Sequence, residues 1–271
     1  MRAFAPGSVT AVFAPVEDAD RSMGASFAVA DGVVADVTPL EEPESESESV
    51  VAVDGSPTAF EPVELALDSL GSTARVDLTA EVPIGRGFGA SGAATLATVL
   101  AADREFALGR SREELVDVAH RAEVEAGTGL GDVFVQDRGG LVVGDADGIR
   151  RFERETPVEY VSFGPISTEE ALADDDLMAR IAEVGTETIE GLPEEPSLAE
   201  VTEVAWAFAR EVGLPTPEVE GAVADAEASG GTASMAMVGE TVFAVGVEGV
   251  FEERTRVCSD GAHVLGDGEE P

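Results

Sequence analysis

A glycine-rich segment, Pro83 to Gly92, carries the residue types that most clearly suggest chemistry in this sequence. It reads PIGRGFGASG, with four glycines in the eight positions from Gly85 to Gly92. Glycine lets a backbone turn tightly and lets its N–H groups approach a ligand closely. A helix that begins near Ser91 would also direct its positive end at the same place. The segment therefore favours the binding of a phosphate or a carboxylate, with an ordinary glycine turn as the alternative.

This loop matches neither of two common nucleotide-binding fingerprints. A Walker A loop needs a lysine, and the chain contains none. The glycine spacing in GRGFGASG also differs from the G-x-G-x-x-G of dinucleotide-binding folds. An anionic ligand must therefore be held by arginine, backbone N–H groups, a helix N-terminus or a metal ion.

Two carboxylates stand out in the segment AHRAEVEAGTGLGD, which ends at Asp132. On a helical wheel Glu123 falls at the margin of an apolar stripe, and Asp132 follows a glycine-rich break, so we expect a loop to present it. Carboxylate and hydroxyl oxygens suit Mg²⁺ that also keeps waters and nucleotide phosphates. Glu125 is the less favoured alternative to Glu123, and His120 is expected to be structural or on the surface.

The composition limits the partners of the protein. The chain has 271 residues, with 16 basic residues, all arginine, against 55 acidic ones, for a formal net charge of −39. Such a surface repels phosphate backbones and anionic membranes, so we expect no nucleic acid and no membrane as partner. It is typical of a protein adapted to very high salt. A single cysteine, no long apolar run and no apolar leader predict a cytoplasmic protein without disulfides.

Periodicity predicts the elements that position these residues. A strand over 2–15 is interrupted at Pro6-Gly7, and a strand pair over 25–37 turns at Asp31-Gly32. The acidic run 41–49 is expected to be a solvated loop. Further strands are predicted at 50–53, 75–82 and 141–143, and helices at 93–106 and 112–126, the second opened by a capping box of Ser111 and Glu114.

The second half of the chain also alternates between helices and strands. Predicted helices span 168–190 and 198–212, a third opens at Thr216-Pro217, and a strand follows over 241–247. The boundary between the halves is expected within 157–165. The sequence therefore predicts an α+β fold with mixed strands and two domains, residues 1–157 and 158–271.

Three segments occur in the order of the three motifs of the GHMP-superfamily kinases. They are APGSVTAVFAP near the start, PIGRGFGASGAA in the middle and SGGTASMAM near the end. The middle one is similar to the P-x-x-x-G-L-G-S-S-A-A loop of that superfamily. Within it, AHRAEVEAGTGLGDV, followed by Gln136, and TASMAMVGETVFAVG resemble the archaeal pantoate kinases, which phosphorylate pantoate with ATP on the archaeal route to coenzyme A. A halophilic archaeal source would also fit the acidic composition.

The resemblance implies a fold and an activity. It implies a GHMP kinase fold, with a ribosomal protein S5 domain 2-like N-terminal domain, a ferredoxin-like C-terminal domain, and ATP in the cleft between them. The implied reaction is transfer of the γ-phosphoryl of ATP to the primary hydroxyl of pantoate, with Mg²⁺ as cofactor, in a homodimer. Another small-molecule GHMP kinase, for homoserine, shikimate or the mevalonate pathway, remains an alternative. A non-catalytic GHMP-fold binding protein is a second alternative.

The resemblance also assigns roles to residues of the loop and of the acidic segment. Ser91 and Glu123 match the Mg²⁺ ligands, and Asp132 matches the residue that orients or deprotonates the attacking hydroxyl. Ala90 replaces the first serine of the family loop, so one hydroxyl contact is expected to be missing. The residues implied to wrap the triphosphate are Gly85, Gly87, Gly89, Ala90, Ser91 and Gly92.

The acceptor side is less well marked. The segment Arg21–Ala25 resembles a family segment expected near pantoate, which implicates Arg21, Ser22 and Gly24, and Gly231 is expected to approach the phosphates or the substrate. Ser8 stands where mevalonate kinase-like members carry lysine, which argues against mevalonate chemistry in its usual form. An acceptor carboxylate needs a positive partner. The candidates are Arg21, Arg121, Arg138 and Arg150.

Overall fold

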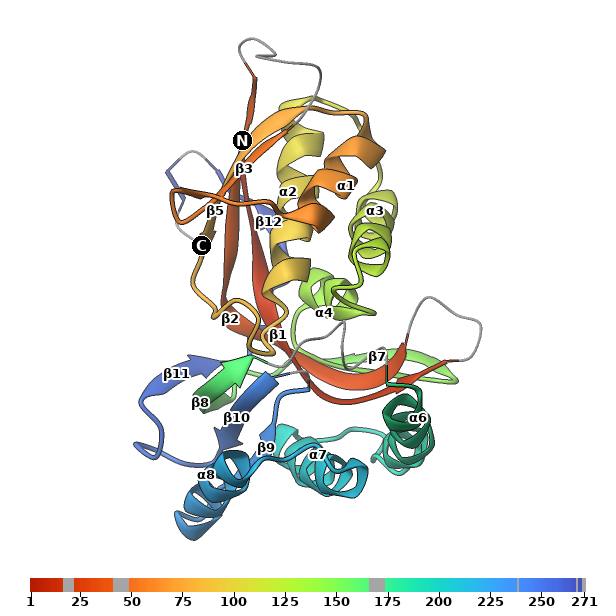
Figure 1. The fold of residues 1–271 in the computed structure, drawn as a ribbon, viewed down its shortest axis with the longest axis vertical. Helices are drawn as coiled ribbons and strands as arrows, with labels where there is room; N and C mark the ends of the chain where they lie inside the picture. Colours follow the sequence, from red (N-terminus) through yellow and green to blue (C-terminus); the bar gives the residue numbers. More distant parts are fainter. Residues whose placement is uncertain (17–21, 41–48, 166–173, 238, 267, 270–271) are drawn as a thin grey trace.

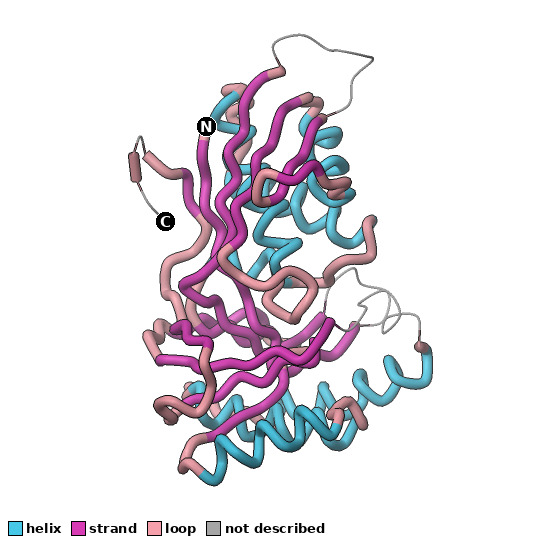
Figure 2. The backbone as a smooth tube through the Cα atoms, turned by 60° about the vertical axis from the view of Figure 1, so that its left-hand side comes forward, coloured by secondary structure: helices cyan, strands magenta, loops and turns pink. Residues whose placement is uncertain are grey.

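Two β-sheets, each covered by helices, form the computed structural model of the protein (Figure 1). It describes residues 1–16, 22–40, 49–165, 174–237, 239–266 and 268–269. Figure 2 shows the helices in two groups, one beside the upper strands and one below the lower strands. The predicted α+β class with mixed strands is confirmed, because the sheets combine antiparallel pairs with one parallel pair, β3 with β5.

The first sheet has the strand order β12-β1-β2-β5-β3-β4, and β6 and β7 extend it beside β2. The strands of this sheet are β1 (Arg2–Pro15), β2 (Ser22–Pro39), β3 (Val50–Val53), β4 (Ser56–Pro57), β5 (Ala74–Ala80), β6 (Leu141–Asp145), β7 (Gly148–Phe152) and β12 (His263–Val264). The helices α2 (Ala90–Glu105) and α4 (Asp132–Arg138) pack against this sheet, and α1 (Glu61–Leu70) and α3 (Arg112–Glu125) pack against α2.

The second sheet has the order β11-β8-β10-β9. Its strands are β8 (Pro157–Pro165), β9 (Thr232–Met235), β10 (Gly239–Val245) and β11 (Glu253–Arg256). The helices α7 (Leu198–Val212) and α8 (Pro217–Ala228) pack against it, whereas α6 (Asp175–Glu190) packs against β1 of the first sheet and against α7. The predicted domain boundary at residues 157 and 158 stays a prediction. The strands on either side of it join different sheets, but β12 near the end of the chain returns to the first sheet.

The long β1–β2 hairpin corrects one prediction. Residues 22–39 form a single strand, and there is no turn at Asp31-Gly32. Pro6 pairs with Gly32 and Gly7 pairs with Val29. The residues between Val29 and Gly32 therefore form a β-bulge within one strand, and they do not form a hairpin turn. A Cβ on Gly32 would lie 2.2 Å from the carbonyl oxygen of Ala5, so this position requires glycine.

The helix signals in the sequence are largely confirmed. Both predicted capping boxes are present, Ser111 with Glu114 on α3 and Ser197 with Glu200 on α7. Thr216 caps α8, and Pro217 occupies its first turn. The described part of the predicted helix over 168–190 begins at Asp175, and the acidic run 41–48 lies outside the described residues. Two helices, α1 and the short α4, fall outside the predicted ones.

Candidate active site

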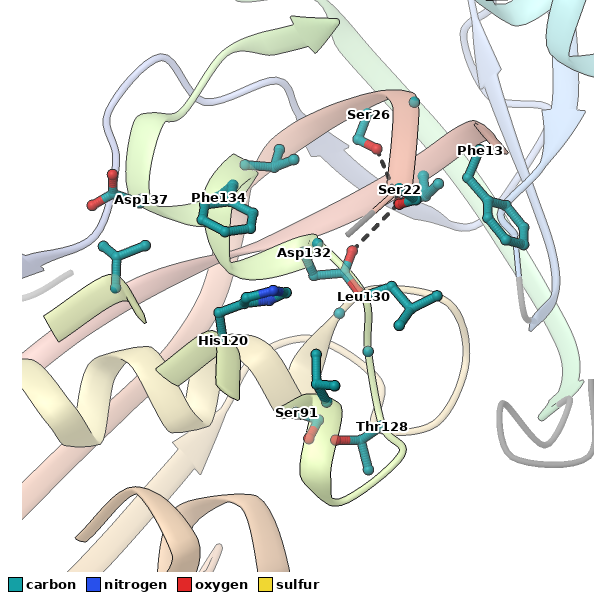
Figure 3. A pocket seen from close by; sticks show the side chains of 18 of the residues that line it. Phe13, Ser22, Ser26, Ser91, His120, Thr128, Leu130, Asp132, Phe134 and Asp137 are labelled. Carbon is teal, nitrogen blue, oxygen red and sulfur yellow. Dashed lines mark hydrogen bonds between the residues drawn. The ribbon is translucent and has the colours of Figure 1, made fainter. Parts of the chain in front are cut away.

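A cavity of about 2880 Å³ lies where the glycine-rich loop, α3, α4, β2 and β6 meet. Its wall includes loop glycines, the hydroxyl of Ser91, the carboxylate of Asp132, and Ser22 and Gly24 of β2. Figure 3 shows Asp132 in the middle of this wall, with Ser22 on one side and His120 and Ser91 on the other. Residues from distant parts of the sequence are thus brought to one cavity.

The glycine-rich loop is held by its carbonyl groups. The backbone N–H of Ser8 donates to the carbonyl oxygen of Phe88 at 2.9 Å. The side-chain amide of Gln136 donates to the carbonyl oxygen of Gly89, and the hydroxyl of Thr241 donates to that of Arg86, both at 2.7 Å. Three separate elements, β1, α4 and β10, therefore fix the shape of the loop.

The N–H groups of the same loop are available to a ligand. Among the described residues, none of the backbone N–H groups from Gly85 to Gly89 donates a hydrogen bond of normal geometry. The helix α2 begins at Ala90, so the free N–H groups of its first turn join this set. Gly85 and Gly87 line the cavity, and both have positive φ. A cradle of unpaired donors at a helix N-terminus fits the triphosphate of a nucleotide.

Glu123 lies directly behind the start of α2. Its side chain is 3% exposed, and its Oε1 accepts hydrogen bonds from the hydroxyls of Ser91 at 2.9 Å and Thr95 at 2.7 Å. Its Oε2 accepts one from Thr128 at 2.8 Å. Burial, with a smaller contribution from the nearby Asp132, raises the pKa of Glu123 to about 6, against the three hydroxyl donors, which lower it. Glu125 is exposed, and within the described residues the Ser91 hydroxyl donates to Glu123 and not to Glu125.

Of the two predicted site acids, Glu123 and Asp132, it is Asp132 that lines the cavity. It begins the short helix α4, so the expectation that a loop presents it is corrected to a helix N-terminus. The hydroxyls of Ser8 and Thr10 donate to its Oδ1 at 3.0 and 3.3 Å. Its enclosed position raises its pKa, and these two hydroxyls act in the opposite direction. Both hydrogen-bond partners are neutral hydroxyls, so no positive charge opposes the binding of a proton to the carboxylate.

Glu123 and Asp132 face the same small space. A Cβ placed on Gly129 would lie 3.4 Å from Oε2 of Glu123 and 3.6 Å from Oδ2 of Asp132. The glycine break after α3 thus lets the chain pass between the two acids. Within the described residues no group of three His, Cys, Asp or Glu side chains could hold a metal ion alone. The donors present, two carboxylates and the Ser91 hydroxyl, are hard oxygens of the kind that suits Mg²⁺ shared with phosphates.

The acceptor-side residues are only partly brought together. Ser22 and Gly24 line the cavity, and the Ser22 hydroxyl lies 3.7 Å from the position of a Cβ on Gly131, next to Asp132. Arg21 lies outside the described residues. His120, expected to be structural or on the surface, is buried, lines the cavity and packs its ring 4.7 Å from that of Phe134.

Gly231 does not lie at this site. It is not among the residues of the cavity wall, and a Cβ there would contact Val245 and Val247. The C-terminal segment that reaches the glycine-rich loop lies a few residues later. A Cβ on Gly239 would come 2.6 Å from the carbonyl oxygen of Arg86, and Met237 lines the cavity. The expectation that Gly231 approaches the phosphates or the substrate is therefore corrected. Gly231 lies before β9, and the chain reaches the glycine-rich loop only after this strand.

The candidate arginines differ in their partners. Arg121 lines the cavity but is paired with Asp117 at 2.6 Å, and its side chain is 69% exposed. Arg150 is not in the wall and is paired with Asp145 at 2.9 Å. Arg138 lines the cavity, donates to the Phe134 carbonyl oxygen at 3.1 Å, and makes no ion pair within the part of the chain that the structure describes.

Several site residues carry little signal in the sequence. Thr95 and Thr128 hold Glu123, and Thr10 holds Asp132. Threonine is common in such segments, so none of the three could have been selected by type. Gln136 is the single glutamine of the chain and is fully buried, and this rarity was the one available hint.

Comparison with known proteins identifies the family. Residues 58–140 match the GHMP kinases N terminal domain. A pantoate kinase of Thermococcus kodakarensis is 30% identical over 96% of this chain and 92% of its own length. This chain belongs to the GHMP kinase family, in the branch of the pantoate kinases. A pantoate kinase of Methanospirillum hungatei is 29% identical over 90% of this chain and 86% of its own length.

Solved structures agree with this assignment. A phosphotransferase related to the CoA biosynthesis pathway has 25% identity and a TM-score of 0.81, covering 97% of this GHMP kinase and 98% of that chain. A mevalonate kinase with 12% identity and a TM-score of 0.65 shares the fold. The predictions of a GHMP kinase fold and of an ATP-dependent small-molecule kinase are confirmed by these similarities. No helix in the described part of the chain is long and apolar enough to cross a membrane.

Proposed function

We propose that this GHMP kinase transfers the γ-phosphoryl group of ATP to the primary hydroxyl of pantoate and forms 4-phosphopantoate. Similarity to two pantoate kinases over most of the chain supports this acceptor. The observation that carries the chemistry is the position of Asp132 in the cavity wall, between the glycine-rich loop and Ser22. Among the described residues its side chain accepts hydrogen bonds only from hydroxyl groups.

The loop supplies the first part of the mechanism. Phosphoryl transfer asks the protein mainly to position the reactants and to stabilise charge. Because the loop carbonyls of Arg86, Phe88 and Gly89 are already bound by the protein, the loop N–H groups can surround the triphosphate. These donors and the start of α2 take over the work that a lysine performs in other phosphate sites.

Asp132 supplies the second part. The hydroxyl of the acceptor would lose its proton to Oδ2 of Asp132 while its oxygen attacks the γ-phosphorus, and ADP would leave. Ser8 and Thr10 hold Oδ1 and so leave Oδ2 for this step. The raised pKa of Asp132 favours proton acceptance over a purely orienting role.

Ser91 and Glu123 would hold Mg²⁺, which neutralises charge on the phosphates. In the structure the Ser91 hydroxyl lines the cavity and Glu123 lies directly behind it. Glu123 ligates only as a carboxylate, and its pKa of about 6 keeps it mostly ionised at neutral pH. We therefore expect the Mg²⁺ requirement to increase in mildly acidic solution.

Arg138 is the best-supported partner for the acceptor carboxylate. The cavity wall contains three arginines, and two of them, Arg112 and Arg121, are already paired with aspartates. Arg138 keeps donors free on the same side as His120 and Phe134. This choice selects one of the four arginines named from the sequence. A homodimer, a cytoplasmic location and a salt-adapted source remain predictions.

An acceptor panel tests the proposal. The purified protein would be assayed for ADP release with ATP and Mg²⁺ in concentrated potassium chloride, with pantoate, homoserine, shikimate and mevalonate as acceptors. We expect pantoate to give the highest kcat/KM, and phosphorus NMR of the product to show a phosphomonoester. A higher kcat/KM with another acceptor would reassign the substrate, and no turnover with any acceptor would support a binding protein without catalysis.

A further inference from the structure

Gln136 lies at the junction of the glycine-rich loop and the helix that carries Asp132. It is fully buried on α4, one helical turn after Asp132. A Cβ on Gly89 would lie 2.7 Å from its Nε2, and a Cβ on Gly92 would lie 2.8 Å from its Oε1. The close approach of α4 to the start of α2 therefore depends on glycine at both positions.

The hydrogen bonds of Gln136 form a connected path. Its Nε2 donates to the carbonyl oxygen of Gly89 at 2.7 Å and to the hydroxyl oxygen of Ser8 at 3.2 Å. The hydroxyl of Ser8 lies 3.0 Å from Oδ1 of Asp132. An amide nitrogen can only donate, so the single hydrogen of Ser8 is left for Asp132. The path runs from the phosphate-binding loop, through Gln136 and Ser8, to the carboxylate.

The orientation of this amide is set by its surroundings. Turning it over would direct the amide oxygen at the carbonyl oxygen of Gly89, and two acceptors would then face each other. In the orientation present, Oε1 is buried without a hydrogen-bond partner among the described residues. An unpaired buried oxygen lowers stability, and an apolar side chain of this size would avoid that loss. The arrangement thus favours a role for the donor group beyond stability.

We propose that Gln136 is a positioning residue of this kinase, which fixes the hydroxyl of Ser8 on Asp132 and sets the place of Asp132 relative to the glycine-rich loop. This rests on the proposed function in one respect, the assignment of Asp132 as the group that acts on the acceptor hydroxyl. Without the amide donor, Ser8 can turn its hydrogen to other acceptors, and α4 loses its link to Gly89.

The test is a double-mutant cycle of Gln136→Met and Ser8→Ala. Methionine has a similar length to glutamine but no donor. Since misplacement by about 1 Å can cost about a hundredfold in rate, we expect Gln136→Met to lower kcat by about tenfold or more, and the KM for ATP to change by a smaller factor. We expect the kcat of the double variant to lie within about twofold of the kcat of the slower single variant, because both substitutions break the same hydrogen-bond path to Asp132.

A control separates this effect from general destabilisation. Thr202 is also fully buried, and its hydroxyl donates only to the carbonyl oxygen of Leu198 in its own helix, among the bonds described. Thr202→Val is expected to leave kcat unchanged. If Gln136→Met does not fold, as judged by circular dichroism, Gln136→Leu replaces it, because leucine is apolar and has no hydrogen-bond donor.

Two results would overturn the proposal. One is an unchanged kcat in the Gln136 variant, with only a lower melting temperature, and the other is a double variant whose loss equals the product of the two single losses. All assays use the acceptor on which the wild-type enzyme is most active. A wrong acceptor assignment therefore shows as a wild-type preference for another compound, whereas a wrong role for Gln136 shows as independent losses in an active enzyme.

Discussion

The hydroxyl of Thr241 donates a hydrogen bond to the carbonyl oxygen of Arg86 at 2.7 Å, and so joins the second sheet to the middle of the glycine-rich loop. Thr241 is fully buried on β10, and the hydroxyl of Ser162 on β8 lies 2.9 Å from its own. The loop that faces the cavity is therefore supported from behind by a sheet built from the second half of the chain.

Replacing Thr241 by valine removes this support with little change of shape. The Arg86 carbonyl oxygen then lacks its partner, which costs about 1–3 kcal/mol of stability for a buried group. We expect the KM for ATP to rise about threefold to tenfold, with a smaller change in kcat, because the loop binds phosphates in both ground and transition states. Steady-state titration of ATP measures this. Thr188→Val on α6, whose hydroxyl bonds only the Val184 carbonyl oxygen in the described chain, is the control. An unaltered KM for ATP would show that the bond does not shape the loop.

Replacing Asp132 by asparagine removes the proton acceptor and keeps the size of the side chain. We expect ATP to bind normally and kcat to fall by about 10²–10⁴-fold, as for other general bases. Nucleotide affinity from calorimetry and kcat from ADP release separate the two effects. Because the pKa of Asp132 is raised, the wild-type kcat is also expected to fall as the pH drops through that pKa. A variant with near-normal kcat would remove Asp132 from the mechanism.

Replacing Glu123 by glutamine tests its ionisation. The pKa of Glu123 rises from 4.5 in the unfolded chain to about 6 in the folded protein, so its ionisation opposes folding. The favourable contribution is complete below pH 4.5 and is lost as the pH rises through about 6. Relative to Glu123→Gln, the wild type is expected to lose about 2 kcal/mol of unfolding free energy between acidic and neutral pH. Urea unfolding at several pH values, without nucleotide and Mg²⁺, measures this, and a constant difference between the two proteins would contradict it.

Replacing Arg138 by methionine tests the acceptor site. Methionine has a long unbranched side chain like arginine and removes the charge, which lies 6.0 Å from the centre of the Phe134 ring. A lost charged hydrogen bond costs about 1.5–3 kcal/mol, so we expect kcat/KM for the acceptor to fall about tenfold or more, while the KM for ATP changes little. Arg121→Gln serves as the matched control, because Arg121 already pairs with Asp117. If only the Arg121 variant loses acceptor affinity, Arg121 and not Arg138 binds the acceptor carboxylate.

Dialysis to low salt tests whether the acidic protein depends on high salt to stay folded. With a formal net charge of −39, self-repulsion grows as the screening length increases at low salt. We expect the melting temperature to fall steadily as potassium chloride is reduced from molar concentrations to about 0.1 M, where the screening length is about 10 Å. Circular dichroism at each concentration follows this. Unchanged folding and activity in dilute salt would show that the protein does not depend on a saline medium.

Much of the fold could be predicted from local signals. Capping boxes at Ser111 and Ser197 fixed two helix starts, because a side chain and a backbone N–H only three residues apart decide them. The bulge opposite Pro6-Gly7 could not be predicted, because Asp31-Gly32 is a good turn on its own and only pairing with β1 makes it part of a strand. Sequence pattern alone carries no information about such a partner strand.

The residues of the candidate site could likewise be predicted only in part. Ser91, Glu123 and Asp132 were selected through the family motifs, and the structure brings Ser91 to Glu123 and places both acids beside Gly129. The hydroxyls that hold the acids, those of Ser8, Thr10 and Thr95, come from β1 and from inside α2. Their approach depends on how the sheet packs against the helices, so spacing in the sequence cannot reveal it.

The pairing of β12 with β1 has a consequence for the order in which the protein assembles during synthesis. Ala3 and Phe4 near the start of the chain pair with Val264 and His263, which the ribosome adds after every strand of the second sheet. The N-terminal half leaves the ribosome early but cannot complete its sheet until these late residues emerge. Until then the outer edge of β1 exposes unpaired N–H and C=O groups to other chains. We therefore expect translation speed and chaperones to affect the yield of active enzyme.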